Sequence, residues 1–309
     1  MTFEHKSVML GEVLDLFKGR NIHRFIDGTL GGAGHSAAIL EAHPEASLLG
    51  LDRDETALAA ATERLAPFKG RWQALHSCYS RMAEAARSIG WDSVDAVLLD
   101  LGVSSPQIDT PERGFSFRFD VPLDMRMDTS QGRTAAELLN GLSEKELADV
   151  FFKYGEEHKS RQIAKAVVAR RQQRPWQGTM EFAKLVSAIV GHGQKNGLPP
   201  ATRCFQALRI AVNDELGELE RGLQAALELL SPGGLLLVIS FHSLEDRIVK
   251  QFFAYQAATC VCPPGLPVCV CGKQSRLEIL TRKPLRPTDA ELAANSRASC
   301  AKLRGALKK

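Results

Sequence analysis

Several features are missing from this 309-residue chain, and their absence excludes some classes of protein. No window approaches the roughly 18 uninterrupted apolar residues of a membrane-spanning helix. The opening segment, MTFEHKSVMLGEVLDLF, has acidic residues among its apolar ones and lacks a signal-peptide pattern. The net charge of +3 is too small to indicate nucleic-acid binding by itself, and no internal repeat is evident. We therefore expect a cytoplasmic globular protein that does not enter a membrane.

Short apolar stretches, each closed by polar or glycine residues, predict a parallel sheet buried on both faces. They lie at residues 23–30, 46–54, 71–77, 95–102 and 233–243. Helical segments such as residues 34–44 and 54–68 lie between the first four stretches and give β–α–β alternation. The first 105 residues are therefore expected to form a doubly wound α/β sheet.

The alternation then stops, and the following residues show helical periodicity instead. Ser143 and Glu146 form a capping-box pattern, and Gly191 is a stop signal for a helix that begins near residue 179. Apolar residues three or four apart predict one long helix from Thr202 to Leu230, ended by SPGG.

The length of the chain exceeds that of a usual single domain, so a second domain or an insertion is expected. We place the core at residues 1–107 and 206–309, and a helical insertion at residues 108–205. The stretch GHGQKNGLPPATR, residues 191–203, is expected to be a mobile loop at the return of the insertion.

The stretch FIDGTLGGAGHS, residues 25–36, has four glycines within seven residues directly after a strand. Such a turn lets backbone N–H groups approach a ligand closely, as dinucleotides and S-adenosylmethionine require. The dinucleotide pattern G-x-G-x-x-G fits only in part, because Ala37 stands where the third glycine belongs. Asp27 favours S-adenosylmethionine, since a carboxylate orients its cationic methionine end directly or through water but repels a pyrophosphate.

Two further predicted strands end on carboxylates. Asp52 closes the second strand and is placed to accept hydrogen bonds from ribose hydroxyls, which both cofactors possess. Its alternative role, capping the next helix, suits Asp54 better. Asp100 closes the fourth strand, where a buried acid is costly unless it binds something. We expect Asp27, Asp52 and Asp100 to converge on one cleft.

A series of motifs along nearly the whole chain resembles the RsmH (MraW) family of ribosomal RNA methyltransferases. The motifs are DGTLGGAGHS, LDRDETAL, LLDLGVSSPQIDTPERGFSF, PLDMRMD, YGEE, TRCFQALRIAVNDEL and ISFHSLEDRIVK. The resemblance implies a Rossmann-like class I S-adenosylmethionine-dependent methyltransferase fold with an inserted helical substrate-recognition domain. It also implies methylation of the exocyclic N4 amine of a cytidine in the decoding region of 16S ribosomal RNA, with that RNA or the small ribosomal subunit as partner.

The same resemblance implies which residues contact the cofactor. Family members often have glycine at position 33, which matters only if that position needs a positive φ, and we expect the loop to tolerate alanine. A second role is open to His35, as a cap or cover for the first helical turn. Tyr79 suits either a wall beside the adenine or a hydrogen-bond donor. The implied contacts are Ala33, Gly34, His35, Asp52, Tyr79, Asp100 and Gln107. Asp27, favoured above from its place at the end of the first strand, is added to this set.

The segment SSPQ, residues 104–107, stands where amino-methyltransferases of nucleic acids carry an Asx/Ser-Pro-Pro-aromatic motif. A cytosine N4 is a poor nucleophile, and acceptors that hold its hydrogens favour its attack on the methyl group. We expect Ser105 and nearby carbonyls to be these acceptors, with Asp100 supporting the sulfonium or the amine. Because glutamine replaces the aromatic residue, the flipped base is expected to stack on Phe115, Phe117 or Phe241.

Two roles are open to His242, at the end of the fifth strand. It either accepts the proton that the amine releases or braces the HSLED turn, where Ser243 and Asp246 form a capping-box pattern. A cytidine C5 methyltransferase is not expected, since Cys78 lies in SCYS rather than in a Pro-Cys turn.

Basic residues concentrate at residues 153–174 and from Lys273 to the final AKLRGALKK. Such runs are usually solvated faces unless binding is argued independently. A role in RNA methylation would require phosphate contacts from lysine or arginine. The candidates are Arg113, Arg118, Arg126, Arg161, Arg170, Arg171 and Arg203.

Four of the seven cysteines form the stretch CVCPPGLPVCVC: Cys260, Cys262, Cys269 and Cys271. Paired C-x-C units across a proline-glycine turn can present four thiolates tetrahedrally, and a cytoplasmic chain argues against disulfides. The sequence leaves open both a structural zinc site and a reduced, metal-free loop.

Two functions compete with RNA methylation. One is a catalytically silent RNA-binding assembly factor that keeps the methyltransferase fold. The other is a nicotinamide-dependent oxidoreductase, against which the partial glycine pattern and Asp27 count. The sequence leaves a homodimer open.

Overall fold

The computed structural model describes residues 7–191, 199–263 and 268–309, which form two compact units. Unit 1 comprises Met1–Gly102 and Leu216–Lys309, and unit 2 comprises Val103–Glu215. Most of the loop expected at residues 191–203 lies outside the described residues. Among the helices in the described ranges, none has the length and apolar character needed to cross a membrane.

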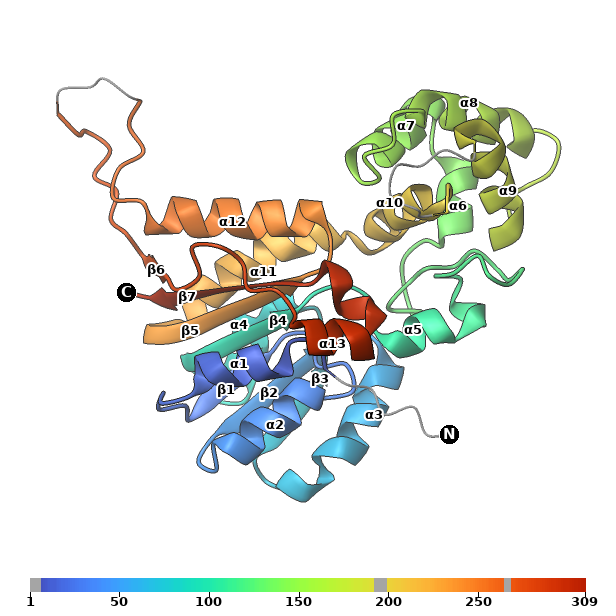
Figure 1. Ribbon diagram of the computed structural model, residues 1–309. Helices are drawn as coiled ribbons and strands as arrows, with labels where there is room; N and C mark the ends of the chain where they lie inside the picture. The colour runs from blue at the N-terminus through green and yellow to red at the C-terminus, as the bar shows by residue number, and fades with distance from the viewer. Residues whose placement is uncertain (1–6, 192–198, 264–267) are drawn as a thin grey trace. The chain divides into compact units, whose positions relative to one another are not determined.

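Unit 1 is built on a seven-stranded sheet in the order β3-β2-β1-β4-β5-β7-β6 (Figure 1). The first five strands are parallel, whereas β7 runs antiparallel to both β5 and β6. Strand β1 lies between β2 and β4, so the carboxyl ends of these three strands are neighbours. The strands are β1 (Arg24–Asp27), β2 (Ser47–Asp52), β3 (Trp72–His76), β4 (Val94–Asp100), β5 (Leu230–Ser240), β6 (Leu277–Ile279) and β7 (Lys302–Lys308).

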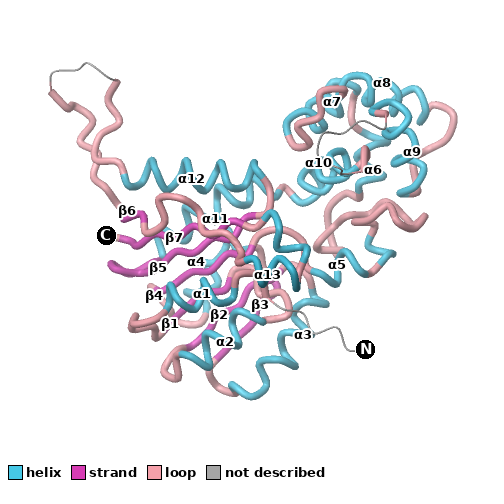
Figure 2. Tube along the Cα trace, in the orientation of Figure 1, coloured by secondary structure: helices cyan, strands magenta, loops and turns pink. Residues whose placement is uncertain are grey.

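Helices cover both faces of this sheet because successive strand residues point to opposite sides (Figure 2). Ile26, Leu49 and Leu99 pack against α4 (Met82–Ser88), α11 (Glu215–Leu229) and α12 (Ser243–Ala257). Their strand neighbours Phe25 and Leu98 pack on the other face. The helices that cover it are α1 (Leu10–Phe17), α2 (Gly34–Ala42) and α3 (Glu55–Leu65), and the short α13 (Asp289–Ala294) precedes β7 in the chain.

The end of the basic C-terminal run forms the antiparallel strand β7, whereas basic residues earlier in the run are exposed: Arg276, Arg282, Lys283 and Arg286. Arg304 is 7% exposed, and its Nε donates to Asp246 Oδ1 at 2.7 Å. Lys302 Nζ lies 3.0 Å from the other oxygen of Asp246. These ion pairs explain why a basic segment occupies an interior position in the sheet.

Unit 2 is helical and has its own apolar core, in which Trp176 and Phe182 are fully buried. The capping box predicted at Ser143 and Glu146 is confirmed, and Gly191 ends α9 as expected, with a φ of 78°. The helices are α5 (Ser105–Asp109), α6 (Ala135–Gly141), α7 (Glu144–Lys153), α8 (Ser160–Arg171), α9 (Thr179–Val190) and α10 (Thr202–Asn213).

The prediction of a single helix from Thr202 to Leu230 is wrong. The segment forms two helices, α10 and α11, separated by Asp214 at φ 49° and ψ 39°. This left-handed conformation ends α10, since it cannot continue a right-handed helix. The SPGG segment lies inside β5, where the pairing between β4 and β5 is irregular.

Candidate active site

The three strand-end acids come together as expected. Asp27, Asp52 and Asp100 are the last residues of β1, β2 and β4. Burial is the largest cause that raises the pKa of Asp27 and of Asp100, and neighbouring charge adds to it: Asp52 acts on Asp27, and Asp27 acts on Asp100, so the carboxylates are close enough to interact. Three acids at one sheet edge form a site suited to a cation or to hydroxyl donors.

Asp27 braces the glycine turn from inside. Its side chain is 2% exposed, and burial is the main cause that raises its pKa to about 6. Ser36 Oγ donates to Oδ2 at 2.6 Å, and the Thr29 N–H donates to Oδ1 at 3.1 Å. Because Asp27 is almost fully buried and both of its oxygens accept from the turn and from α2, this geometry favours an indirect contribution to ligand binding.

The turn between β1 and α2 needs small residues at defined positions. A Cβ on Gly28 would lie 2.5 Å from Leu99 Cδ2 and 2.8 Å from Tyr79 Cβ. At Gly32 a Cβ would meet nothing within 4 Å, so the backbone there is open. Ala33 has a φ of 57°, which shows that this position does adopt the left-handed conformation. Alanine is accommodated there at a cost of about 1–2 kcal/mol relative to the right-handed region.

Asp52 links the glycine turn to the start of α3. Its Oδ2 accepts from the Gly31 N–H at 2.8 Å, and its Oδ1 accepts from the Asp54 N–H at 2.9 Å. Burial raises its pKa. A carboxylate has about four acceptor positions, so Asp52 can also receive hydroxyl donors. The cap of α3 is Asp54, as expected, because its Oδ1 accepts from the Thr56 N–H.

Asp100 has an acceptor atom that the described residues leave unsatisfied. Its side chain is 25% exposed, yet its Oδ1 is buried and has no hydrogen-bond partner among the described residues. Oδ2 lies 3.6 Å from Nδ1 of His35, and Thr29 Oγ1 accepts from the Asp100 N–H at 2.6 Å. Burial, followed by the charges of Asp27 and Glu245, raises its pKa well above the usual value. A cationic ligand group beside Oδ1 would relieve this unfavourable burial.

His35 and Tyr79 are buried beside these acids rather than exposed. His35 is 5% exposed, and its Nε2 lies 2.9 Å from the carbonyl oxygen of Val8. Tyr79 is 6% exposed, and its ring packs against Gly222 of α11, where a Cβ would lie 2.3 Å from Tyr79 Cδ2. His35 is therefore held in place by a polar contact, and Tyr79 by packing, and neither depends on a ligand.

The capping box predicted at Ser243 and Asp246 is wrong. His242 is the N-cap of α12, and Glu245 completes the box: the Glu245 N–H donates to His242 Nδ1 at 3.4 Å. The second imidazole nitrogen lies 3.1 Å from Glu245 Oε1. Asp246 binds β7 instead. Since both ring nitrogens face Glu245, these contacts favour the bracing role of His242 over proton acceptance.

Ser105 and Gln107 belong to α5, in unit 2. Gln107 is 5% exposed, and its Oε1 accepts from the Ser104 N–H at 3.0 Å, which fixes the start of this helix. For Ser105 the structure describes only the backbone, as the first residue of α5. Its role as an amine acceptor stays a prediction.

An exposed aromatic residue was not singled out by the sequence. Phe115 and Phe117 pack against the core of unit 2, and Phe241 packs against the core of unit 1. Phe119, from the same RGFSFRFD stretch, is 58% exposed. The neighbouring Arg118 is also exposed. Phe115, Phe117 and Phe119 lie two residues apart in the sequence, so no local pattern distinguishes Phe119 from the other two.

Most arginines proposed for RNA contact serve the fold of unit 2. Arg126 forms a bidentate pair with Asp124 at 2.8 and 2.9 Å, which lowers the pKa of Asp124. Arg170 pairs with Glu181, and Arg171 donates to the carbonyl oxygens of Leu139 and Leu142. Arg113 and Arg203 donate to backbone carbonyls as well. Exposed guanidinium groups remain at Arg118 and Arg161.

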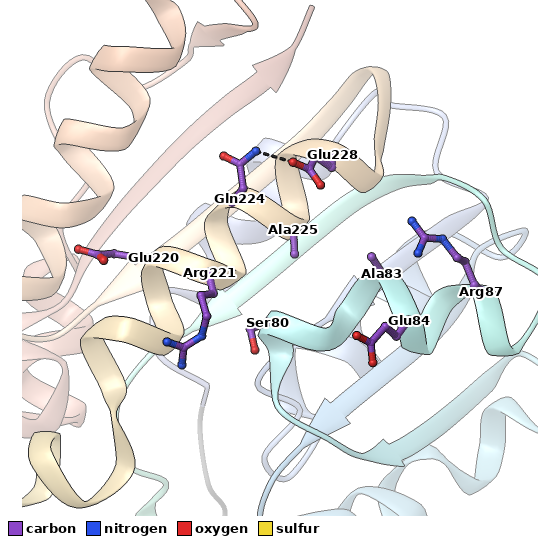
Figure 3. A pocket seen from close by; sticks show the side chains of 9 residues that line it. All are labelled: Ser80, Ala83, Glu84, Arg87, Glu220, Arg221, Gln224, Ala225 and Glu228. Atoms are coloured by element: carbon purple, nitrogen blue, oxygen red, sulfur yellow. Dashed lines mark hydrogen bonds between the residues drawn. The ribbon is translucent and has the colours of Figure 1, made fainter.

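A shallow groove of unit 1 lies between α4 and α11 (Figure 3). Both acidic and basic side chains line it, and none of the three strand-end acids does. Its lining residues are Ser80, Ala83, Glu84, Arg87, Glu220, Arg221, Gln224, Ala225 and Glu228. The groove is therefore separate from the candidate site.

The strand order, with one antiparallel strand inserted between β5 and β6, is that of class I S-adenosylmethionine-dependent methyltransferases. The acids at the ends of β1, β2 and β4 occupy the carboxyl edge of the sheet, where proteins with such sheets bind their ligands. A family model described as the MraW methylase family matches residues 2–309, and the chain belongs to this family.

Three similar relatives are each named "Ribosomal RNA small subunit methyltransferase H". The relative from Geobacter sulfurreducens is 52% identical, with 100% of both chains covered. That from Carboxydothermus hydrogenoformans is 47% identical over 100% of this chain and 99% of the relative. That from Symbiobacterium thermophilum is 50% identical over 100% of this chain and 98% of the relative. The resemblance found in the motifs is thereby confirmed.

Proposed function

We propose that this enzyme transfers a methyl group from S-adenosylmethionine to the exocyclic N4 amine of a cytidine in the decoding region of 16S ribosomal RNA. Family membership over residues 2–309 supports an RNA methyltransferase, and the names of the relatives support the small-subunit RNA as substrate. The observation that carries the proposed site is the buried, unsatisfied Oδ1 of Asp100.

The residues of the site fit the donor. Donor binding would place an electrophilic methyl group, carried on a cationic sulfur, at this edge of the sheet. Asp100 offers its unsatisfied oxygen to the cationic sulfonium of the donor, and Asp52 has acceptor positions left for ribose hydroxyls. The open backbone at Gly32 allows close approach, while Asp27 keeps the turn in shape.

The chain must also prepare the amine for reaction. Ser105 and nearby carbonyls would accept the N4 hydrogens and draw the nitrogen toward sp³ geometry, so that its lone pair attacks the methyl carbon as the carbon–sulfur bond breaks. The nitrogen becomes acidic after it has gained the methyl group. Its proton then passes to water or to a weak acceptor, and a dedicated strong base is unnecessary.

Nucleoside mass spectrometry of unmodified small subunits treated with the enzyme tests the product. We expect N4-methylcytidine, and we expect Ser105→Ala to lower kcat more than it changes the donor Kd, because the serine acts on the amine. A sole product of 5-methylcytidine or of a 2′-O-methyl nucleoside would contradict the mechanism. No methyl transfer would favour the assembly factor, and binding of NADH without S-adenosylmethionine would favour the oxidoreductase.

The exposed pair of Arg118 and Phe119 is proposed to contact the RNA, by phosphate attraction and base stacking. The variant Arg118→Ala/Phe119→Ala should raise the apparent KM for RNA roughly tenfold, since a lost stacking contact alone is worth about 1–3 kcal/mol. The slope of affinity against salt should also fall by about one.

A matched control is available on α7, where Phe152 is 57% exposed and Lys153 is also exposed. Phe152→Ala/Lys153→Ala removes an exposed aromatic and an exposed basic side chain from another part of unit 2. This variant should leave the KM for RNA and its salt slope unchanged. An equal effect of both double variants would show that Arg118 and Phe119 have no specific part in RNA binding.

A further inference from the structure

The four clustered cysteines lie outside the chemistry of methyl transfer. They occupy an excursion of unit 1 between α12 and β6, visible in Figure 1 as two extended arms. Cys260 and Cys262 lie on the outgoing arm, and Cys269 and Cys271 lie on the returning arm. The arms are joined at their base, where the Arg276 N–H donates to the Gln256 carbonyl oxygen at 2.8 Å. Although the cysteines come from two different arms, all four Sγ atoms lie within 4.8 Å of one another.

The sulfur positions match a tetrahedral metal site. The Sγ atoms of Cys262 and Cys269 are 3.9 Å apart, those of Cys269 and Cys271 are 3.5 Å apart, and those of Cys271 and Cys260 are 3.9 Å apart. A zinc–sulfur bond of about 2.3 Å gives a regular tetrahedron an edge of about 3.8 Å. Three sulfur–sulfur distances are therefore close to the value that a tetrathiolate zinc ion requires.

Apolar packing does not account for this convergence. Val261, Val268 and Val270 of the two arms are 47%, 70% and 79% exposed, so these side chains do not form a core. An excursion of this size cannot bury enough apolar surface to hold its shape, and small units of this kind are usually stabilised by a metal or by disulfides.

Backbone donors near the cluster also suit thiolate ligands. The Val261 N–H donates to Cys271 Sγ at 3.5 Å, and the Cys262 N–H donates to Cys260 Sγ at 3.4 Å. Such N–H···S hydrogen bonds orient the sulfur atoms and disperse the negative charge of a tetrathiolate site. Each of these two donors comes from the outgoing arm, so the contact to Cys271 also connects the arms.

We propose that Cys260, Cys262, Cys269 and Cys271 bind one structural Zn²⁺ ion. The four protein sulfurs complete the tetrahedron, and a closed site leaves no position for substrate, so the ion stabilises the excursion and takes no part in catalysis. Binding replaces thiol protons by metal–sulfur bonds and releases those protons to solvent, with no change of oxidation state. The proposal is independent of the RNA substrate.

Metal analysis of the full-length protein, purified under reducing conditions without chelators, tests this site. We expect about one equivalent of zinc per chain, and we expect added Co²⁺ to give the visible absorption of a tetrahedral thiolate complex after the zinc is removed. Cys262→Ser/Cys269→Ser should lose the zinc and the cobalt spectrum. Cys300→Ser, which removes an exposed cysteine outside the cluster, should retain both.

Protease sensitivity of the excursion provides a second measurement. Chelation of the wild-type protein should increase cleavage between Ala258 and Arg276, whereas the double cysteine variant should be cleaved equally with and without chelator. Stoichiometric iron in place of zinc, an intact mass that shows two disulfides, or metal-free protein whose Co²⁺ spectrum lacks thiolate ligands would each overturn the proposal.

Discussion

Replacing Asp100 with asparagine is expected to lower kcat/KM by about 100-fold while leaving unit 1 at least as stable as in the wild type. The loss corresponds to about 2.7 kcal/mol, within the range for a charged hydrogen bond removed from a ligand. Stability should not fall, because burial and the neighbouring carboxylates Asp27 and Glu245 raise the pKa of Asp100 and disfavour its charged form. Steady-state kinetics and urea unfolding measure the two effects separately.

The same residue predicts the direction of a pH effect. Protonated Asp100 cannot pair with a cation, and its pKa in the free enzyme is raised, so donor affinity should increase with pH until Asp100 is ionised. In Asp100→Asn the part of this dependence that comes from Asp100 should be lost, and only the part from Asp27 and Asp52, whose pKa values burial also raises, should remain. Isothermal titration with S-adenosylmethionine across the pH range measures the affinities in both proteins.

Asp95→Asn is the matched control on the same strand. Its carboxylate accepts from the N–H groups of His23 and Arg24 and is not a strand-end acid of the candidate site. This variant should lose some stability but keep its kcat/KM. An Asp100→Asn enzyme with activity within threefold of the wild type would remove Asp100 from the site.

Replacing Asp52 with alanine should weaken donor binding by about 1–3 kcal/mol, which is roughly a 5- to 150-fold increase in Kd. Two losses contribute: the acceptor proposed for the ribose hydroxyls, and the hydrogen bonds from the Gly31 and Asp54 N–H groups that hold the turn. Calorimetric titration with the donor measures the change directly.

Asp54→Ala separates these losses from a general effect on α3. It removes the helix cap and should reduce the free energy of unfolding by about 1 kcal/mol, with the donor Kd unchanged. Asp52→Asn should be intermediate, since its amide keeps one acceptor oxygen. If Asp52→Ala binds the donor as tightly as the wild type, the ribose contact is assigned to the wrong residue.

The positions of Asp27, Asp52 and Asp100 could be predicted from the sequence because each follows directly from the end of an apolar run. In a parallel sheet, the ends of neighbouring strands meet at one edge, so a local pattern determines a three-dimensional cluster. The capping box at Ser143 was predictable for the same reason, since both of its residues lie within one helical turn.

Other features depend on partners far away in the chain. The basic tail becomes β7 because Asp246 of α12 neutralises Arg304 and Lys302, which no local pattern reveals. At the start of α12, two overlapping capping patterns compete, and Glu245 pairs with His242 while Asp246 is taken by β7. The break at Asp214 replaces one expected helix by two, although the apolar spacing continues across it. The unsatisfied oxygen of Asp100 depends on the burial of one atom, which residue order does not show.

The hydrogen bonds within the glycine turn have a thermodynamic consequence for donor exchange. Fixing the backbone of one residue costs about 1–2 kcal/mol of conformational entropy. In this turn the hydrogen bonds to Asp27 and Asp52 offset that cost when the protein folds, before a donor binds. Under the proposed function, the spent donor differs from the fresh one by a single methyl group and its charge. A pre-ordered turn holds the portion that both share, and so cannot tell them apart. Discrimination in favour of the fresh, cationic donor therefore falls to the unsatisfied oxygen of Asp100.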